Sequence, residues 1–181
     1  MMERLVCVAI GYLFGLFQTA YIYGKLHGID IRNYGSGNAG TTNTLRVLGT
    51  KAGLIVLAGD ILKCILAIAA VRLLFAGGVH EDMYYLLAMY AALGAILGHD
   101  YPFYLGFKGG KGILVSAGAM LILSPWSLLL CLAAFLLFAS LTRYISAGSI
   151  AAGATYPFGV MLVTCLTAGS IHWAEVALAA V

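Results

Sequence analysis

The sequence predicts an all-α membrane protein: a polytopic bundle of six to seven transmembrane helices, with the N-terminus outside the cell. Composition is the first reason, because 62% of the 181 residues are hydrophobic and only 9% are charged, too few to cover a surface in water. The apolar residues gather in runs, several of which approach the roughly 20 residues that a helix needs to cross a bilayer. The basic residues collect at alternate connections between these runs. We therefore expect residues 1–181 to form a single integral membrane domain.

Each apolar run predicts one helix. In chain order the runs cover 5–23, 52–75, 84–97, 112–123, 126–141, 150–168 and 173–181. The first is too long for a cleavable signal peptide and is interpreted as a membrane anchor. The second is long enough to span alone, whereas the third and fourth gain length from flanking small residues. Ser124-Pro125 separates the fourth from the fifth, because proline suits a helix start. The sixth is again long, and the seventh is short at the chain end.

The distribution of basic residues predicts the orientation of the helices. If odd-numbered spans run from outside to inside, the outer side holds Arg4 and Arg72. The inner loops then hold seven basic residues: Lys25, Arg32, Arg46, Lys51, Lys108, Lys111 and Arg143. Because basic residues favour the cytoplasmic side of a membrane, these loops are expected to face the cytoplasm. The polar motifs of the chain lie in the same loops.

The first inner loop, "YGSGNAGTTNTLRVLG" over residues 34–49, has an unusual density of hydrogen-bonding groups. Its polar side chains are Ser36, Asn38, Thr41, Thr42 and Asn43, interleaved with glycines that let backbone amides converge on a ligand. We expect Thr42 or Asn43 to cap a short helix that carries Arg46, with its positive end facing an anion. The alternative is an ordinary polar turn.

The second inner loop, "GHDYPFYLGFKGGKG" over residues 98–112, combines glycines with two lysines. It does not satisfy the G-x-x-x-x-G-K-[ST] pattern of a nucleotide phosphate loop, because Gly112 follows Lys111. Exposed glycine N–H groups, the charges of Lys108 and Lys111, and the start of the next helix nevertheless predict an anion cradle at the membrane face. His99 could act as an acid or base or donate a hydrogen bond to a phosphate oxygen; the alternative is a histidine held by the backbone at a helix end.

Two further polar groups complete the pattern. The third inner loop, "TRYISAGS" over residues 142–149, adds one cation close to the start of the next helix. Within run 52–75, Asp60 and Lys63 are three residues apart and share a helix face. Because charges inside a membrane are costly unless paired, we expect a structural ion pair, with orientation of the phosphate-binding loops as the functional alternative.

Several kinds of chemistry are not indicated. The four cysteines stand alone in apolar runs, which favours packing over a disulfide framework or a zinc site. The loops contain no carboxylate pair, no metal-ligand cluster, no Ser-His-Asp spacing and no nucleic-acid motif. Cationic loops at one membrane face instead suit substrates that are partly lipid and partly phosphorylated. The alternative hypothesis is an anion or phosphate transporter, although transporter sites usually lie at the membrane midplane between repeats. A third hypothesis is a lipid-binding scaffold.

The loop motifs resemble those of a known family. "GSGNAGTTNTLRVLG", "DILK", "GHDYPF" followed by "FKGGKG", and "RYISAGSI" are similar to motifs of the bacterial membrane-integral acyl-phosphate:glycerol-3-phosphate acyltransferases, the PlsY family. The resemblance extends over residues 12–168. It implies transfer of a fatty acyl group from acyl phosphate to the sn-1 hydroxyl of glycerol 3-phosphate. Lysophosphatidic acid and phosphate would be the products, with no metal, cofactor or acyl-CoA needed.

The resemblance also implies roles for individual residues. The catalytic set would be Ser36, Arg46, His99, Lys108 and Lys111. The substrate-binding set would be Asn38, Thr42, Asn43, Gly98, Gly109, Gly110, Gly112, Arg143, Ser146 and Ser149. Partners would be acyl phosphate, glycerol 3-phosphate and membrane lipid, without nucleic acid, at the cytoplasmic face of the bacterial cell membrane. Acyl-chain preference and oligomeric state are not encoded in these motifs.

The end of the chain departs from the family pattern. Members carry a last cytoplasmic motif after the seventh helix, with a histidine and an asparagine near "HxxNIxR". This chain ends at Val181, within the expected seventh helix. The C-terminal helix and last motif are thus expected to be incomplete.

Overall fold

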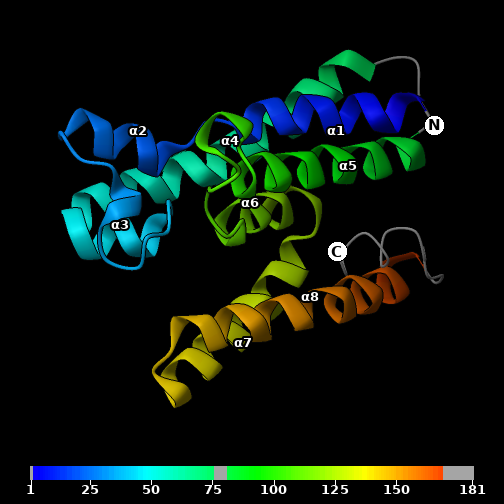
Figure 1. The fold of residues 1–181 in the computed structure, drawn as a ribbon. Helices are drawn as coiled ribbons and strands as arrows, with labels where there is room; N and C mark the ends of the chain where they lie inside the picture. Colours follow the sequence, from blue (N-terminus) through cyan, green and yellow to red (C-terminus); the bar gives the residue numbers. More distant parts are fainter. Residues whose placement is uncertain (1, 76–80, 169–181) are drawn as a thin grey trace. The chain divides into compact units, whose positions relative to one another are not determined.

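The computed structural model describes residues 2–75 and 81–168, and its regular elements there are all helices (Figure 1). They are α1 (Met2–Gly15), α2 (Thr19–Leu26), η1 (Ile31–Asn33), α3 (Thr41–Leu48), α4 (Thr50–Phe75), α5 (Glu81–Asp100), η2 (Phe103–Leu105), α6 (Ile113–Leu123), α7 (Pro125–Thr142) and α8 (Ile145–Ala168). The expected all-α class is confirmed. The seventh run, 173–181, lies outside the described residues.

Among the residues that the structure describes, four segments are long and apolar enough to span a membrane. They are Met2–Leu26, Thr50–Phe75, Pro125–Thr142 and Ile145–Leu166. The predicted run 52–75 therefore coincides with α4, and Pro125 occupies the first turn of α7 as expected. The runs 84–97 and 112–123 form α5 and the short apolar helix α6.

The chain divides into two compact units, residues 1–119 and 120–181. In the first, α1 and α5 lie side by side (Figure 1), and glycines allow the close approach. A Cβ added at Gly11 or Gly15 would collide with the backbone of α5, and one at Gly94 or Gly98 with the backbone of α1. Each helix thus presents two small residues four positions apart, an arrangement that lets membrane helices touch along their backbones.

The first predicted span, 5–23, is not one continuous helix. The structure ends α1 at Gly15 and begins α2 at Thr19, and Gln18 has non-helical dihedral angles of φ −90° and ψ 84°. The continuous helix was therefore a wrong prediction. The apolar pattern on both sides of the break is unchanged, so hydropathy alone gives no sign of it.

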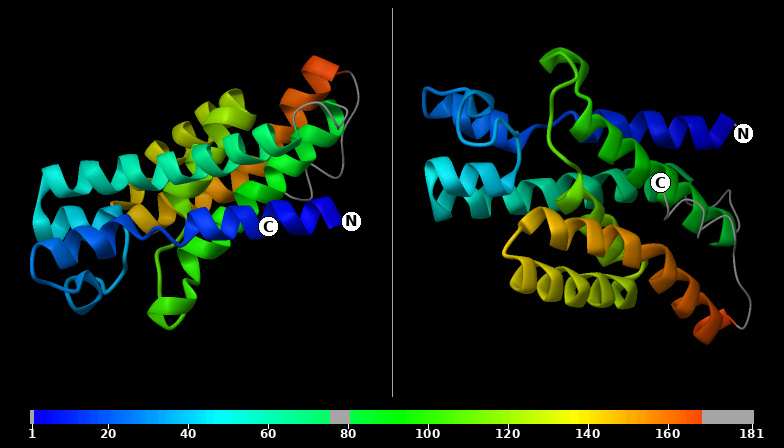
Figure 2. Two further views of the ribbon diagram at one scale, coloured as in Figure 1. Left: turned by 90° about the horizontal axis from the view of Figure 1, so that it is seen from above. Right: turned by 60° about the horizontal axis from the view of Figure 1, so that its bottom comes forward.

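The second unit contains the end of α6 followed by α7 and α8, which lie side by side (Figure 2). Arg143 joins α7 to α8 in the left-handed conformation, at φ 61°. Cys131 in this unit is buried, as are Cys7 and Cys64 in the first, in agreement with the expected packing role. Cys165 differs, because it is exposed.

Candidate active site

Asn43 organises the first inner loop. Its Oδ1 accepts a hydrogen bond from the Ser36 N–H at 2.8 Å, and its Nδ2 donates to the carbonyls of Ile31 and Tyr34 at 3.1 and 2.9 Å. The side chain is almost completely buried. One amide group therefore holds residues 31–36 against α3 and fixes the backbone of Ser36.

The short helix α3 exists as predicted, but its cap differs. Gly40 occupies the N-cap position, so the expectation that Thr42 or Asn43 caps the helix was wrong. Asn43 instead turns back to the preceding loop, where three backbone groups need partners. Thr42 is exposed in the first turn, and Arg46 is exposed in the last.

Other predicted residues of this loop lie near its surface. Ser36 is exposed and Asn38 is half-buried. The Asn38 side chain lies beside Gly40, where a Cβ would come within 2.8 Å of its Oδ1. Ser36 and Arg46 are therefore open to a ligand, whereas Asn43 is engaged within the protein.

Arg32 ties the first inner loop to the second. Its guanidinium donates to both carboxylate oxygens of Asp30, at 3.0 and 2.8 Å, and to the Leu105 carbonyl at 3.1 Å. The hydrogen bonds from Arg32 lower the pKa of the Asp30 carboxyl to about 2. Sequence reasoning treated Arg32 only as a loop charge; its Asp-x-Arg spacing was the available signal for a local ion pair.

The second inner loop folds back onto the end of α5. The Gly109 N–H donates to the Asp100 carbonyl at 3.1 Å, and the Gly110 N–H donates to the His99 carbonyl at 3.0 Å. These two amides are therefore not free for an anion, contrary to the expectation that the loop glycines expose their N–H groups. Lys108 and Lys111 do remain exposed.

The glycines of this loop allow its backbone to pack closely against the end of α5. A Cβ on Gly110 would overlap the ring of His99, and one on Gly109 would overlap the His99 carbonyl. Gly112 has φ 64° and lies beside Asp100. Gly98, also predicted to bind substrate, is buried in the contact with α1.

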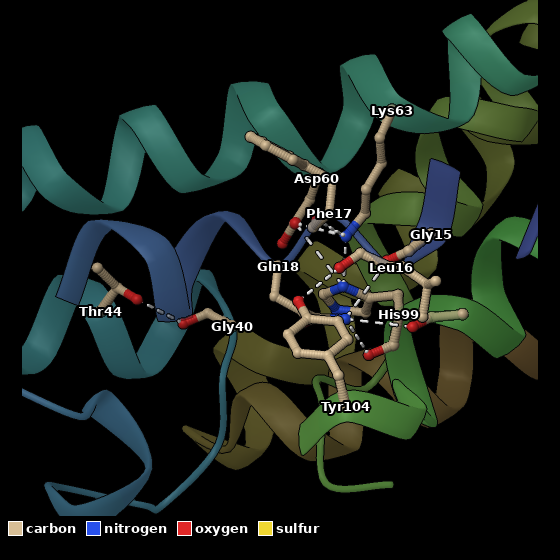
Figure 3. A network of polar contacts seen from close by, with 11 residues as sticks. Gly15, Leu16, Phe17, Gln18, Gly40, Thr44, Asp60, Lys63, His99 and Tyr104 are labelled. Carbon is tan, nitrogen blue, oxygen red and sulfur yellow. Dashed lines mark hydrogen bonds and ion pairs between the residues drawn. The ribbon is translucent and has the colours of Figure 1, made fainter. Parts of the chain in front are cut away.

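A buried polar cluster lies behind the loop (Figure 3). Asp60, Lys63 and His99 have exposed fractions of only 2%, 3% and 3%. Lys63 Nζ is 3.0 Å from Asp60 Oδ1, which confirms the predicted ion pair, and 2.5 Å from His99 Nδ1. One ring nitrogen of His99 is thus already engaged by a lysine, and the histidine lies beneath the loop surface.

Sequence reasoning missed Gln18, which is completely buried at the break between α1 and α2. Its Nε2 lies 2.8 Å from the His99 carbonyl, 3.2 Å from that of Gly98 and 3.4 Å from that of Gly15. A signal was present, because a glutamine within an apolar run has to find partners inside the protein.

The third predicted segment belongs to the second unit. Arg143 and Ser146 are exposed, and the Ser149 hydroxyl donates to the Ile145 carbonyl within α8 at 3.0 Å. Within the described residues, no cluster of three or more His, Cys, Asp or Glu side chains has the arrangement of a metal site.

The first unit thus combines two features. Exposed cations lie on two loops that Arg32 connects, and buried hydrogen bonds support these loops.

Known proteins are similar to this chain in sequence and in fold. The family model described as glycerol-3-phosphate acyltransferase matches residues 5–181. The chain is 41% identical over 165 residues to a glycerol-3-phosphate acyltransferase of Clostridioides difficile, covering 88% of this chain and 78% of that one. For the corresponding protein of Chlorobaculum tepidum the identity is 43% over 162 residues, covering 87% and 70%.

Solved structures of an integral membrane glycerol 3-phosphate acyltransferase, PlsY (YgiH), are also similar. Its glycerol 3-phosphate form matches with a TM-score of 0.78 and 31% identity, covering 97% of this chain and 82% of that one. Its lysophosphatidic acid form matches with a TM-score of 0.77 and 30% identity, over the same shares of the two chains.

Proposed function

Because this chain belongs to the glycerol-3-phosphate acyltransferase family, we propose that it transfers a fatty acyl group from acyl phosphate to the sn-1 hydroxyl of glycerol 3-phosphate. The products are lysophosphatidic acid and phosphate. The observation that carries the proposal is the pair of loops bearing the exposed cations Arg46, Lys108 and Lys111. Family membership also disfavours the alternative hypothesis of an anion or phosphate transporter.

Acyl phosphate suits such a site because it is a mixed anhydride with a good leaving group. The acceptor hydroxyl oxygen attacks the acyl carbon, the bond from that carbon to the phosphate oxygen breaks, and the hydroxyl proton passes to a phosphate oxygen. No covalent enzyme intermediate is required. The protein has to bring two anions together and stabilise the developing negative charge.

The exposed residues divide these tasks. The planar guanidinium of Arg46 can hold a phosphate through two parallel hydrogen bonds. The ammonium groups of Lys108 and Lys111 contribute positive charge. The Ser36 hydroxyl lies on a backbone fixed by Asn43, so it is suited to a directed hydrogen bond with substrate. Arg143, Ser146 and Ser149 of the second unit are proposed as substrate-binding residues in their own right. The loops are proposed to face the cytoplasm of a bacterial cell.

Alanine substitution of the cations tests the proposal. A hydrogen bond to a charged group contributes about 1.5–3 kcal/mol, so Lys108→Ala and Lys111→Ala should each lower kcat/KM roughly 10- to 150-fold. Arg46→Ala should lose at least as much. The assay is steady-state acyl transfer to glycerol 3-phosphate in liposomes, corrected for folded protein.

Arg72→Ala is the matched control, since Arg72 lies in the last turn of α4, over the ring of Tyr84. It should behave like the unmodified protein. If Lys108→Ala and Lys111→Ala match this control, the second loop is a membrane-surface anchor and the proposal fails.

A further inference from the structure

The break between α1 and α2 leaves three backbone carbonyls without helical partners. A side chain binds each of them, one from Gln18 in the break itself and two from other segments. Gln18 Nε2 approaches the Gly15 carbonyl at 3.4 Å, the Tyr104 hydroxyl donates to Leu16 at 2.7 Å, and Lys63 Nζ donates to Phe17 at 3.1 Å. A helix break at membrane depth persists only where such groups are satisfied. The break is therefore a stable feature of the fold, held by specific side-chain hydrogen bonds.

The same side chains bind the end of α5. Gln18 Nε2 donates to the carbonyls of Gly98 and His99, and Lys63 Nζ contacts His99 Nδ1 (Figure 3). Lys63 in turn pairs with Asp60 on its own helix. Two buried side chains, one from the break and one from α4, thus fix both the backbone and the ring of His99.

The end of α5 is in turn the support of the lysine loop. The His99 carbonyl that accepts from Gln18 also accepts from the Gly110 N–H, and the Asp100 carbonyl accepts from the Gly109 N–H. Gly110 lies against the His99 ring so closely that a Cβ would overlap it. Displacement of His99 therefore has to displace the loop between Lys108 and Lys111.

We propose that Gln18 and Lys63 are positioning residues for the reaction, which hold His99 and through it the loop that carries Lys108 and Lys111. His99 then acts on the loop rather than on substrate. Lys63 fills this role because its single ammonium group joins α4, the break and α5. This inference rests on the proposed function for its kinetic consequences, but its structural consequence is independent of the reaction.

Hydrogen exchange of the backbone amides over residues 101–112 tests the structural part. Gln18→Met keeps the length of the side chain and removes its donors, and the exchange of this segment should accelerate at least about tenfold. Asp60→Asn combined with Lys63→Met should do the same, without leaving an unpaired charge in the membrane. Cys64→Ala, a buried neighbour on α4, is the control and should leave the exchange unchanged.

A double-mutant cycle tests the catalytic part. Gln18→Met should lower kcat/KM at least about tenfold. Its effect should largely disappear in a Lys108→Ala/Lys111→Ala background, because the loop that Gln18 positions then carries neither lysine. In an Arg46→Ala background the effects should multiply. A general loss of stability would not produce this difference.

Two results overturn the inference. One is unchanged exchange both in Gln18→Met and in the Asp60→Asn/Lys63→Met variant; the other is an effect of Gln18→Met that multiplies with that of Lys108→Ala/Lys111→Ala. If the unmodified protein transfers no acyl group from acyl phosphate, the proposed function fails instead. The exchange measurement still decides whether Gln18 and Lys63 hold the loop.

Discussion

Asn43→Ala should disable the first inner loop. The substitution removes three hydrogen bonds, but their costs differ. Ser36 and Tyr34 are exposed, so water replaces the lost partner at about 0.5 kcal/mol each. Ile31 is completely buried, and a buried carbonyl without a donor costs about 1–3 kcal/mol. The sum is about 2–4 kcal/mol.

This free energy should be lost largely within the loop, because all three bonds join residues 31–36 to α3. If the lost free energy appears as disorder of Ser36, kcat/KM should fall roughly 30- to 900-fold at about 1.36 kcal/mol per decade. Asn43→Asp should be as harmful, since it retains the acceptor for Ser36 but places a carboxylate against two carbonyls. The assay is acyl transfer per folded protein, combined with thermal unfolding.

Asn33→Ala is the control, because Asn33 is an exposed asparagine in η1 of the same loop. It should change neither activity nor unfolding. The reasoning is refuted if Asn43→Ala retains the activity of Asn33→Ala, because the buried amide would then have no part in shaping the site.

The orientation and the pH dependence give two further predictions. In a cysteine-free background, cysteines at Thr50 and Gly78 should react with impermeant reagents from opposite sides of the membrane; labelling of both from one side would contradict the cytoplasmic site. Arg32 lowers the pKa of Asp30 below its usual 3.8, to about 2, so this pair stabilises the fold above about pH 4 and loses its contribution as pH falls toward 2. Asp30→Asn should flatten that part of the stability profile in thermal unfolding; an unchanged slope would remove Asp30 as its source.

Local patterns predicted the helices well because hydropathy and proline placement act over neighbouring residues. Run 52–75 became α4, and Ser124-Pro125 separated α6 from α7. The ion pair of Asp60 with Lys63 was also accessible, since a spacing of three residues on a helix defines a shared face.

What the sequence did not predict depends on contacts between distant segments. The break at Gln18 is held by residues some 45 to 90 positions away in the chain. Likewise, the amides of Gly109 and Gly110 turn to carbonyls at the end of α5 instead of outward. A glycine-rich stretch shows that close approach is allowed, but not which partner approaches.

The stoichiometry of the reaction tests the central claim most directly. Purified protein in liposomes would receive acyl phosphate with or without glycerol 3-phosphate, and released phosphate and lysophosphatidic acid would be measured together. The account predicts one phosphate per lysophosphatidic acid formed, and neither product when glycerol 3-phosphate is omitted. Phosphate release that is independent of glycerol 3-phosphate, without lipid product, would contradict it.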